Sequence, residues 1–351
     1  MRFLRLIALV LIITTLLVAC TPTPDEPKRQ ARTYYDFFDT VCTVFSYQGD
    51  EEADFLANCR LAEAMLRDYH RLFDIYYEYS GMSNLKTVND NAGIAPVEVD
   101  GRLIEFLLYA KEMYALTGGE VNVAMGSVLR LWHKCRETAA DRPDLTPALP
   151  DPSDIVEAEK HTDIDDLVID EVASTVYLAD PHMSLDVGAL GKGYVADRLT
   201  ELLTDRGATA YVLNLGGSIR AIGERVSGGG WVTGITNPDR ESEESFALRV
   251  TLTDVSCVTS GNYERYFTVD GRRYHHIIDK DTGSPAVGFS SVTILAESSA
   301  MADALSTALF CMSYEDGLAL AERLGGIEVL WITEDGEQLM TDGFRELVIK
   351  E

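Results

Sequence analysis

The sequence predicts an α+β protein in which mixed or antiparallel sheets pack with helices into a single intertwined catalytic unit. Three observations support this prediction. Helix-like and strand-like runs are present without a regular β-α-β rhythm or a repeat of fixed period. The strand-like runs concentrate after residue 166. The chain has 351 residues, 46% of them hydrophobic and 25% charged, which is enough to build a large core.

The first half of the folded region consists mainly of predicted helices. Residues 39–48 alternate like a strand. Apolar residues at helical spacing predict a helix over 53–74, and a second helix over 102–119 ends in glycines. A third helix is expected over 127–138. A loop rich in Pro and Asp then leads into a short acidic helix. The segment 137–162 could contact a partner or be a decoration of the fold, and decoration is the favoured interpretation.

The second half consists mainly of predicted strands. Residues 167–180 resemble a hairpin, 195–207 a helix, and 208–217 a strand that ends in glycines. A further helix is expected over 299–312, and a last helix and hairpin close the chain. Additional short strands are expected over 231–238, 246–252 and 291–298.

The N-terminal segment has the pattern of an exported lipoprotein. Arg2 and Arg5 precede an apolar run over 6–17, which is too short for a comfortable membrane span. The residues LVAC, ending at Cys20, resemble the bacterial lipobox, in which the cysteine is lipidated. We therefore expect a signal peptide over 1–19 and a lipid anchor on Cys20 that holds the protein at the cell membrane, facing the extracytoplasmic side. A plain signal peptide cut elsewhere and an uncleaved anchor are the alternatives.

The composition after the signal peptide excludes some function classes. Residues 20–33 are polar and Pro-rich, which suits an extended tether, and the folded domain is expected over 34–351. The net charge of −27 argues against nucleic acid as a partner, because such binding needs a basic surface. Without Cys20, five of the six cysteines remain, and none forms a CxxC pair. A disulfide scaffold or a structural zinc site is therefore disfavoured.

A glycine-rich stretch, DVGALGKGYVADRL, occupies residues 186–199. It has neither the Walker A order nor the G-x-G-x-x-G order of a dinucleotide fingerprint. It still predicts a strand, a glycine turn and a helix start, with Lys192 inside. Such a turn can bind phosphate through its backbone N–H groups and a lysine charge. A tight packing turn explains the glycines equally well.

A carboxylate and a hydroxyl recur on a later predicted helix. Asp303 and Thr307 are four residues apart and therefore share a helix face. Their oxygens could bind a hard cation such as Mg²⁺. Alternatively, Asp303 interacts with the helix dipole, and Thr307 bonds back to its own backbone.

Two adjacent histidines, His275 and His276, stand in the stretch YHHIIDKDTG. On a strand they would point to opposite faces, so they could not easily bind one metal together. One of them could act as a general base near neutral pH. The alternative is a pair of ordinary strand residues, one of them buried and hydrogen-bonded.

Several motifs taken in order resemble the ApbE family, the FAD:protein FMN transferases. The resemblance extends from about Tyr34 to the C-terminus. The motifs that carry it are SNLKTVN, VNVAMG, DVGALGKGYVAD, NLGGSIRAIG, TSGNYERYF, HIIDKDTGSP and ADALSTALF.

The resemblance implies a reaction and a metal. FAD is split at its pyrophosphate, the FMN half is transferred to a Thr or Ser hydroxyl of an acceptor protein, and AMP is released. Such enzymes require Mg²⁺, and the resemblance assigns the metal to the side chains of Asp303 and Thr307 and the carbonyl of Ala189. The acceptors would be extracytoplasmic electron-transfer proteins.

The resemblance also implies substrate contacts and a base. Asp186, Lys192 and Asn122 match positions that contact FAD, and His276 matches the histidine that takes the proton of the acceptor hydroxyl. His275 is then expected to face away and to be structural. Because the protein is acidic, Mg²⁺ and Lys192 must supply the positive charge that a pyrophosphate reaction needs.

Four positions depart from the family pattern. Asn122 and Ala124 stand where many relatives carry Asp and Thr, Ser218 replaces a frequent acidic or amide residue, and Lys280 replaces a common Pro. Two other functions remain open from the sequence. A metal-dependent FAD pyrophosphatase would use water in place of the acceptor hydroxyl, and a flavin-binding lipoprotein would perform no catalysis.

Overall fold

A computed structural model describes residues 29–142 and 147–350. The predicted signal peptide, Cys20 and the predicted tether up to residue 28 lie outside the described residues, as do residues 143–146 of the segment 137–162. Within the described ranges, no helix has both the length and the apolar character needed to cross a membrane.

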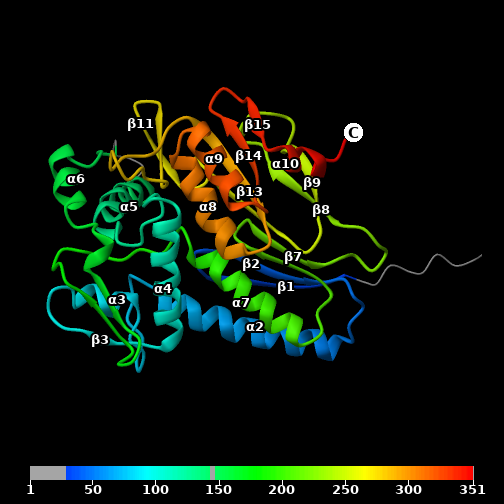
Figure 1. Cartoon of the computed structure of the whole chain (residues 1–351), viewed down its shortest axis with the longest axis horizontal. Helices are drawn as coiled ribbons and strands as arrows, with labels where there is room; N and C mark the ends of the chain where they lie inside the picture. Colours follow the sequence, from blue (N-terminus) through cyan, green and yellow to red (C-terminus); the bar gives the residue numbers. More distant parts are fainter. Residues whose placement is uncertain (1–28, 143–146, 351) are drawn as a thin grey trace, which may run out of the picture.

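An antiparallel sheet of eight strands forms the centre of the described part of the chain (Figure 1). Each strand pairs antiparallel with its neighbours. The α+β prediction with antiparallel sheets is therefore confirmed. In sheet order the strands are β1 (Gln30–Phe37), β2 (Thr40–Ser46), β6 (Ala210–Leu215), β7 (Ser218–Gly223), β10 (Ser256–Gly261), β13 (Phe289–Ala296), β14 (Glu328–Thr333) and β15 (Gln338–Met340).

The folded region begins earlier than predicted. β1 starts at Gln30, which pairs with Ser46 of β2, so residues 30–33 belong to the sheet and not to the tether. Their polar composition resembles a linker, but main-chain pairing with β2 decides the structure. The Tyr34 hydroxyl donates a hydrogen bond to the Cys59 carbonyl at 2.8 Å and fastens β1 to helix α2 (Glu52–Phe73).

Helices cover one face of this sheet, and a hairpin covers the other. α2, α7 (Gly191–Asp205), α8 (Ser299–Cys311) and α9 (Tyr314–Leu324) lie on the helical face (Figure 1). On the other face, β8 (Trp231–Thr236), β9 (Phe246–Leu252) and α10 (Asp342–Leu347) form a second apolar cluster with the sheet. α8 buries almost every side chain, so the sheet and α7 enclose it.

A helical region extends from one end of the sheet (Figure 1). It contains a small sheet in the order β3-β5-β4 and a short hairpin of β11 and β12. The loop predicted over 137–162 is shorter than expected, because α5 continues to Asp141 and α6 begins at Pro152. The elements are α3 (Leu85–Asp90), β3 (Val97–Glu98), α4 (Gly101–Leu116), α5 (Gly126–Asp141), α6 (Pro152–Glu159), a 3-10 turn (Ile164–Asp166), β4 (Leu167–Asp170), β5 (Thr175–Leu178), β11 (Tyr266–Val269) and β12 (Arg272–His275).

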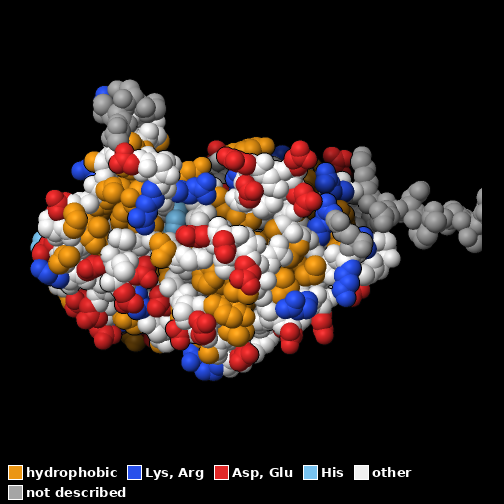
Figure 2. Space-filling model, turned by 90° about the horizontal axis from the view of Figure 1, so that it is seen from above, with side chains coloured by type: hydrophobic (Ala, Val, Ile, Leu, Met, Phe, Trp, Pro, Cys, Tyr) orange, Lys and Arg blue, Asp and Glu red, His pale blue; other side chains and the backbone are white. Residues whose placement is uncertain are grey.

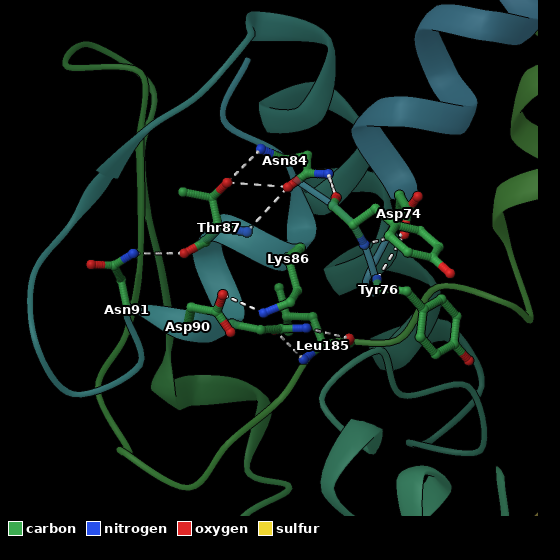
Figure 3. Close-up of polar contacts among 10 residues, drawn as sticks. Asp74, Tyr76, Asn84, Lys86, Thr87, Asp90, Asn91 and Leu185 are labelled. Carbon is green, nitrogen blue, oxygen red and sulfur yellow. Dashed lines mark hydrogen bonds and ion pairs between the residues drawn. The ribbon is translucent and has the colours of Figure 1, made fainter. Parts of the chain in front are cut away.

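The SNLKTVN stretch builds a rigid corner in this region (Figure 3). Asn84 caps α3 by accepting a hydrogen bond from the Thr87 N–H at 3.1 Å. Its amide also donates to the Arg71 and Tyr77 carbonyls, both at 2.9 Å. Asn84 is fully buried, and both the nitrogen and the oxygen of its amide are hydrogen-bonded, as a buried polar group requires.

Candidate active site

Helices α7 and α8 cross where α7 begins, and Gly193 makes the crossing possible. A Cβ atom at residue 193 would lie 2.3 Å from the Ser299 carbonyl oxygen and 2.5 Å from the Asp303 Cβ. Instead, the Gly193 N–H donates to Asp303 Oδ2 at 2.8 Å. The glycine turn is therefore a packing turn that also presents its N–H group to a buried carboxylate.

Gly193→Ala is expected to separate the two helices. The added methyl group meets backbone, which cannot give way cheaply, so we expect a loss of about 1–3 kcal/mol in the free energy of unfolding, together with a loss of transfer activity. Thermal or denaturant unfolding measures the first effect. Gly101→Ala is the matched control, because Gly101 also lies in a first helical turn and a Cβ there meets nothing within 4 Å. Equal destabilisation by both variants would contradict this role.

Lys192 and Asp303 form the charged centre of the crossing. Lys192 Nζ lies 3.8 Å from Asp303 Oδ1 and donates to the Gly188 carbonyl at 3.4 Å. Burial raises the pKa of Asp303, while Lys192 and the Gly193 N–H act in the opposite direction. The Asp303 carboxylate is thus buried with less positive charge around it than a full ion pair would supply.

The predicted metal ligands fit a hard cation. In a regular helix the Gly193 N–H would bond to the Ala189 carbonyl, but it bonds to Asp303, and no other described residue donates to that carbonyl. Thr307 Oγ1 lies 3.4 Å from Ser260 Oγ, on the side of α8 that faces β10. Carboxylate, hydroxyl and carbonyl oxygens are the ligand types that Mg²⁺ prefers. Among the described residues there is no group of three or more His, Cys, Asp or Glu side chains suited to a metal. The predicted ligands do not form such a group, because Asp303 is the single side chain of these types among them.

Asp186 lies where three of the sequence motifs meet. Its N–H donates to the Val123 carbonyl at 2.8 Å, and its Oδ1 accepts from the Gly188 N–H at 2.9 Å. The Asn89 side chain holds the preceding residue, Leu185, by accepting from its N–H at 2.7 Å and donating to its carbonyl at 3.0 Å. Figure 3 shows Leu185 against this corner. The corner therefore fixes the start of the glycine turn.

Both the nitrogen and the oxygen of the Asn122 amide form hydrogen bonds within the protein. Nδ2 donates to the Thr162 carbonyl at 2.8 Å, and Oδ1 accepts from the Ala124 N–H at 2.9 Å. Asn122 also lines a cavity of about 370 Å³, together with Lys160 and Lys280. The amide holds the turn that forms this wall, and a contact between Asn122 and FAD stays a prediction.

The expectation that both histidines lie on a strand is wrong, because β12 ends at His275. His275 is buried, and its Nε2–H donates to the Ala286 carbonyl at 2.9 Å. Its Nδ1 accepts from the Ile277 N–H at 3.3 Å. Both ring nitrogens are engaged, so His275 is structural, as expected. The two rings differ because His276 lies in the bend after the strand, where alternation between faces no longer applies.

His276 is available as a base. Its side chain is partly buried, and its Nδ1 is a buried atom without a hydrogen-bond partner in the described part of the chain. Burial, together with the positive charges of Arg265 and Lys192, lowers the pKa of His276 to about 3. The imidazole is therefore neutral at neutral pH and keeps a lone pair for a proton. The charge of Lys192, which lies 3.8 Å from Asp303 Oδ1, is among those that act on His276, and the role of His276 as the base stays a prediction.

Helix α5 also lies against this site, which the sequence motifs did not indicate. His133 Nδ1 lies 3.9 Å from Asp186 Oδ2 and 3.3 Å from the Tyr76 hydroxyl. Arg136 follows three residues later, on the same face of α5. The spacing of His133 and Arg136 was visible in the sequence, but such spacing is also typical of a solvated helix face.

Comparisons with known proteins agree with this geometry. The family model for the ApbE family matches residues 38–331. An FAD:protein FMN transferase of Treponema pallidum is 35% identical over 313 residues, which cover 84% of this chain and 82% of that protein. A protein of the same name from Klebsiella pneumoniae is 29% identical over 282 residues, covering 80% and 84%.

Solved structures give the same result. The ApbE protein of Thermotoga maritima superimposes with a TM-score of 0.80 at 27% identity, covering 92% of this chain and 100% of that chain. The flavin transferase ApbE of Vibrio cholerae gives a TM-score of 0.76 at 26% identity, covering 91% and 99%. The match of sequence and fold shows that this chain belongs to the ApbE family.

Proposed function

We propose that this chain is an FAD:protein FMN transferase, which uses Mg²⁺ and transfers the FMN half of FAD to a Thr or Ser hydroxyl of an acceptor protein. One observation supports it above others: where α7 and α8 cross, Lys192 lies beside the buried Asp303 carboxylate, and the charge of Lys192 also acts on the neutral His276. The relatives that bear this name match over most of the chain.

Transfer of a phosphoryl group depends on positioning and on neutralising charge. The Asp303 and Thr307 side chains and the Ala189 carbonyl would hold Mg²⁺, whose charge would stabilise the pyrophosphate oxygens during transfer. Lys192 adds a second positive charge beside Asp303. The Gly193 N–H keeps the Asp303 carboxylate in place.

His276 takes the proton in the proposed reaction. The acceptor hydroxyl oxygen bonds to the phosphorus on the FMN side, and the bond from that phosphorus to the bridging oxygen breaks. AMP leaves with the bridging oxygen, and the hydroxyl proton passes to the His276 imidazole. A positioned base of this kind typically contributes about 10²–10⁴ in rate.

We also propose that Cys20 carries a lipid and holds the enzyme at the extracytoplasmic face of the cell membrane, where it serves electron-transfer proteins. The support is the sequence alone, namely the basic residues, the short apolar run and the residues before Cys20. Cys20→Ser is expected to release the protein from the membrane fraction of expressing cells. A variant that still sediments with the membranes would contradict the anchor.

A mass measurement tests the reaction. The mature chain is mixed with FAD, Mg²⁺ and an acceptor that carries a Thr in a short Ser/Thr-Gly-Ala-Ser/Thr stretch. We expect the acceptor to gain the mass of an FMN group while AMP accumulates. Release of free FMN and AMP without labelling of several acceptors would instead identify a pyrophosphatase.

A further inference from the structure

Several positively charged side chains act electrostatically on His276, although the chain has a net charge of −27. Lys192 at the start of α7, Arg136 on α5 and Arg265 before β11 all act electrostatically on its imidazole. Figure 2 shows Lys and Arg side chains beside a histidine on one face of the molecule. In a protein this acidic, such a cluster indicates a site for an anion.

Aromatic packing brings the cluster together. The Trp132 ring of α5 stacks on Tyr274 of β12, with ring centroids 6.0 Å apart. Trp132 Nε1 donates to the Gly283 carbonyl at 2.7 Å. α5 is thereby fixed against the β11–β12 hairpin, which is flanked by Arg265 on one side and His276 on the other. Arg136 is one helical turn from Trp132, so it lies on the side of α5 that faces this hairpin.

Neither arginine is paired with a carboxylate. Arg136 is partly buried and has no hydrogen bond or ion pair to any residue in 29–142 or 147–350. Arg265 Nη2 donates to the Phe38 and Asp39 carbonyls, at 3.4 Å and 3.3 Å. The pKa of Arg136 is lowered by burial and by the charge of Arg265. Glu137 and Asp186 act on Arg136 in the opposite direction, but neither forms an ion pair with it within the described residues, and Arg265 is exposed. Two like charges in this arrangement favour an anionic ligand.

The nearby carboxylates are committed elsewhere. Asp303 is bonded to Gly193 and lies next to Lys192. Asp186 accepts from Gly188 and lies 3.9 Å from His133 Nδ1. Glu137, next to Arg136 on α5, is exposed and offsets part of its charge without an ion pair to it in the described ranges. The remaining charge of Arg136 and Arg265 is available to a ligand.

We propose that Arg136 and Arg265 form a clamp for the phosphate groups of the dinucleotide substrate, an inference that rests on the proposed function. Guanidinium groups bind phosphate oxygens through two parallel hydrogen bonds, which suits a pyrophosphate that must be held in line. A small dinucleotide fits this cluster better than an acidic protein, because the negative charge of the whole chain would repel such a partner. The metal and Lys192 are therefore not the only sources of positive charge.

Binding measurements test the clamp without relying on turnover. The dissociation constants of FAD and of riboflavin, which has no phosphate, are measured by flavin fluorescence with the mature chain, with and without Mg²⁺. Arg136→Gln and Arg265→Gln are each expected to raise the FAD value about 10- to 100-fold, as loss of a charge-assisted hydrogen bond does. Both variants should change the dissociation constant of riboflavin by less than about twofold, because riboflavin has no phosphate for the two arginines to bind.

Arg130→Gln is the matched control, because Arg130 is exposed on the same helix and the substitution changes the charge equally. It should leave both constants unchanged, and thermal unfolding should be alike for all variants. Unchanged FAD binding in Arg136→Gln and Arg265→Gln would overturn the clamp, and so would an equal loss of riboflavin binding. A raised KM for the acceptor with unchanged FAD binding would assign the cluster to the acceptor instead. Failure of the wild type to bind FAD would overturn the proposed function itself.

Discussion

Asp303→Asn is expected to lower the rate of FMN transfer by about 10²–10³-fold and to remove its dependence on Mg²⁺. The amide can still accept the Gly193 N–H, but it lacks the charge that a hard cation requires. Single-turnover transfer, followed by acceptor mass across a Mg²⁺ titration, measures the effect. Mg²⁺ should also raise the unfolding temperature of the wild type and leave that of Asp303→Asn unchanged, because a bound ion stabilises the folded state.

Asp197→Asn is the control for this variant. Asp197 accepts hydrogen bonds from the Ser298 hydroxyl and from the N–H groups of Ser299 and Ala300, so it caps α8 without joining the oxygen donor set. This variant should be less stable by about 1 kcal/mol and should keep the Mg²⁺ response. A normal Mg²⁺ response in Asp303→Asn would show that the metal binds elsewhere.

His276→Ala is expected to lower the transfer rate by about 10²–10⁴-fold while the dissociation constant of FAD stays the same. The substitution removes the base but none of the groups that hold the phosphates. Single-turnover transfer and flavin fluorescence measure the two quantities separately. Transfer at the wild-type rate would show that another group takes the proton.

The pKa of His276 sets the expected pH dependence of this reaction. A histidine with an ordinary pKa of about 6.5 becomes protonated, and useless as a base, as the pH falls through that value. Burial lowers the pKa of His276 to about 3, so the free enzyme keeps its base neutral throughout the range from about pH 5 to 8. The profile of kcat/KM for FAD should therefore show no loss of activity centred near pH 6.5. A loss centred there would mean that His276 is exposed to water in solution.

Periodic patterns in the sequence were sufficient to predict much of the fold. The apolar repeats of α2 and α4 and the nearly continuous apolar run of α8 identify these helices, because each helix buries a face that the pattern already shows. β1 was missed for the opposite reason. Its first residues resemble a tether, and only the presence of β2 beside them makes a strand.

The site was predictable in its parts but not in its assembly. Glycines around Lys192 and oxygens on α8 each had two explanations in the sequence. The close approach of Gly193 to Asp303 confirms the packing turn, and phosphate binding at the glycines stays a prediction. Arg136 could not be recognised at all, since on α5 it looks like any solvated charge. Its proposed role depends on the stacking of Trp132 on a hairpin far away in the sequence.

The edge position of β1 has a mechanical consequence. The strand pairs with β2 only, and residues 30–33 are mostly exposed, whereas Tyr34 is buried and hydrogen-bonded to Cys59. A force applied at the N-terminal end would open the pairs in succession from Gln30, because local stability is lowest where few contacts are buried. The buried and hydrogen-bonded Tyr34 would then stop the separation of β1 from β2 before the core unfolds. Under load, residues 30–33 would become the extra length of tether that their composition suggests.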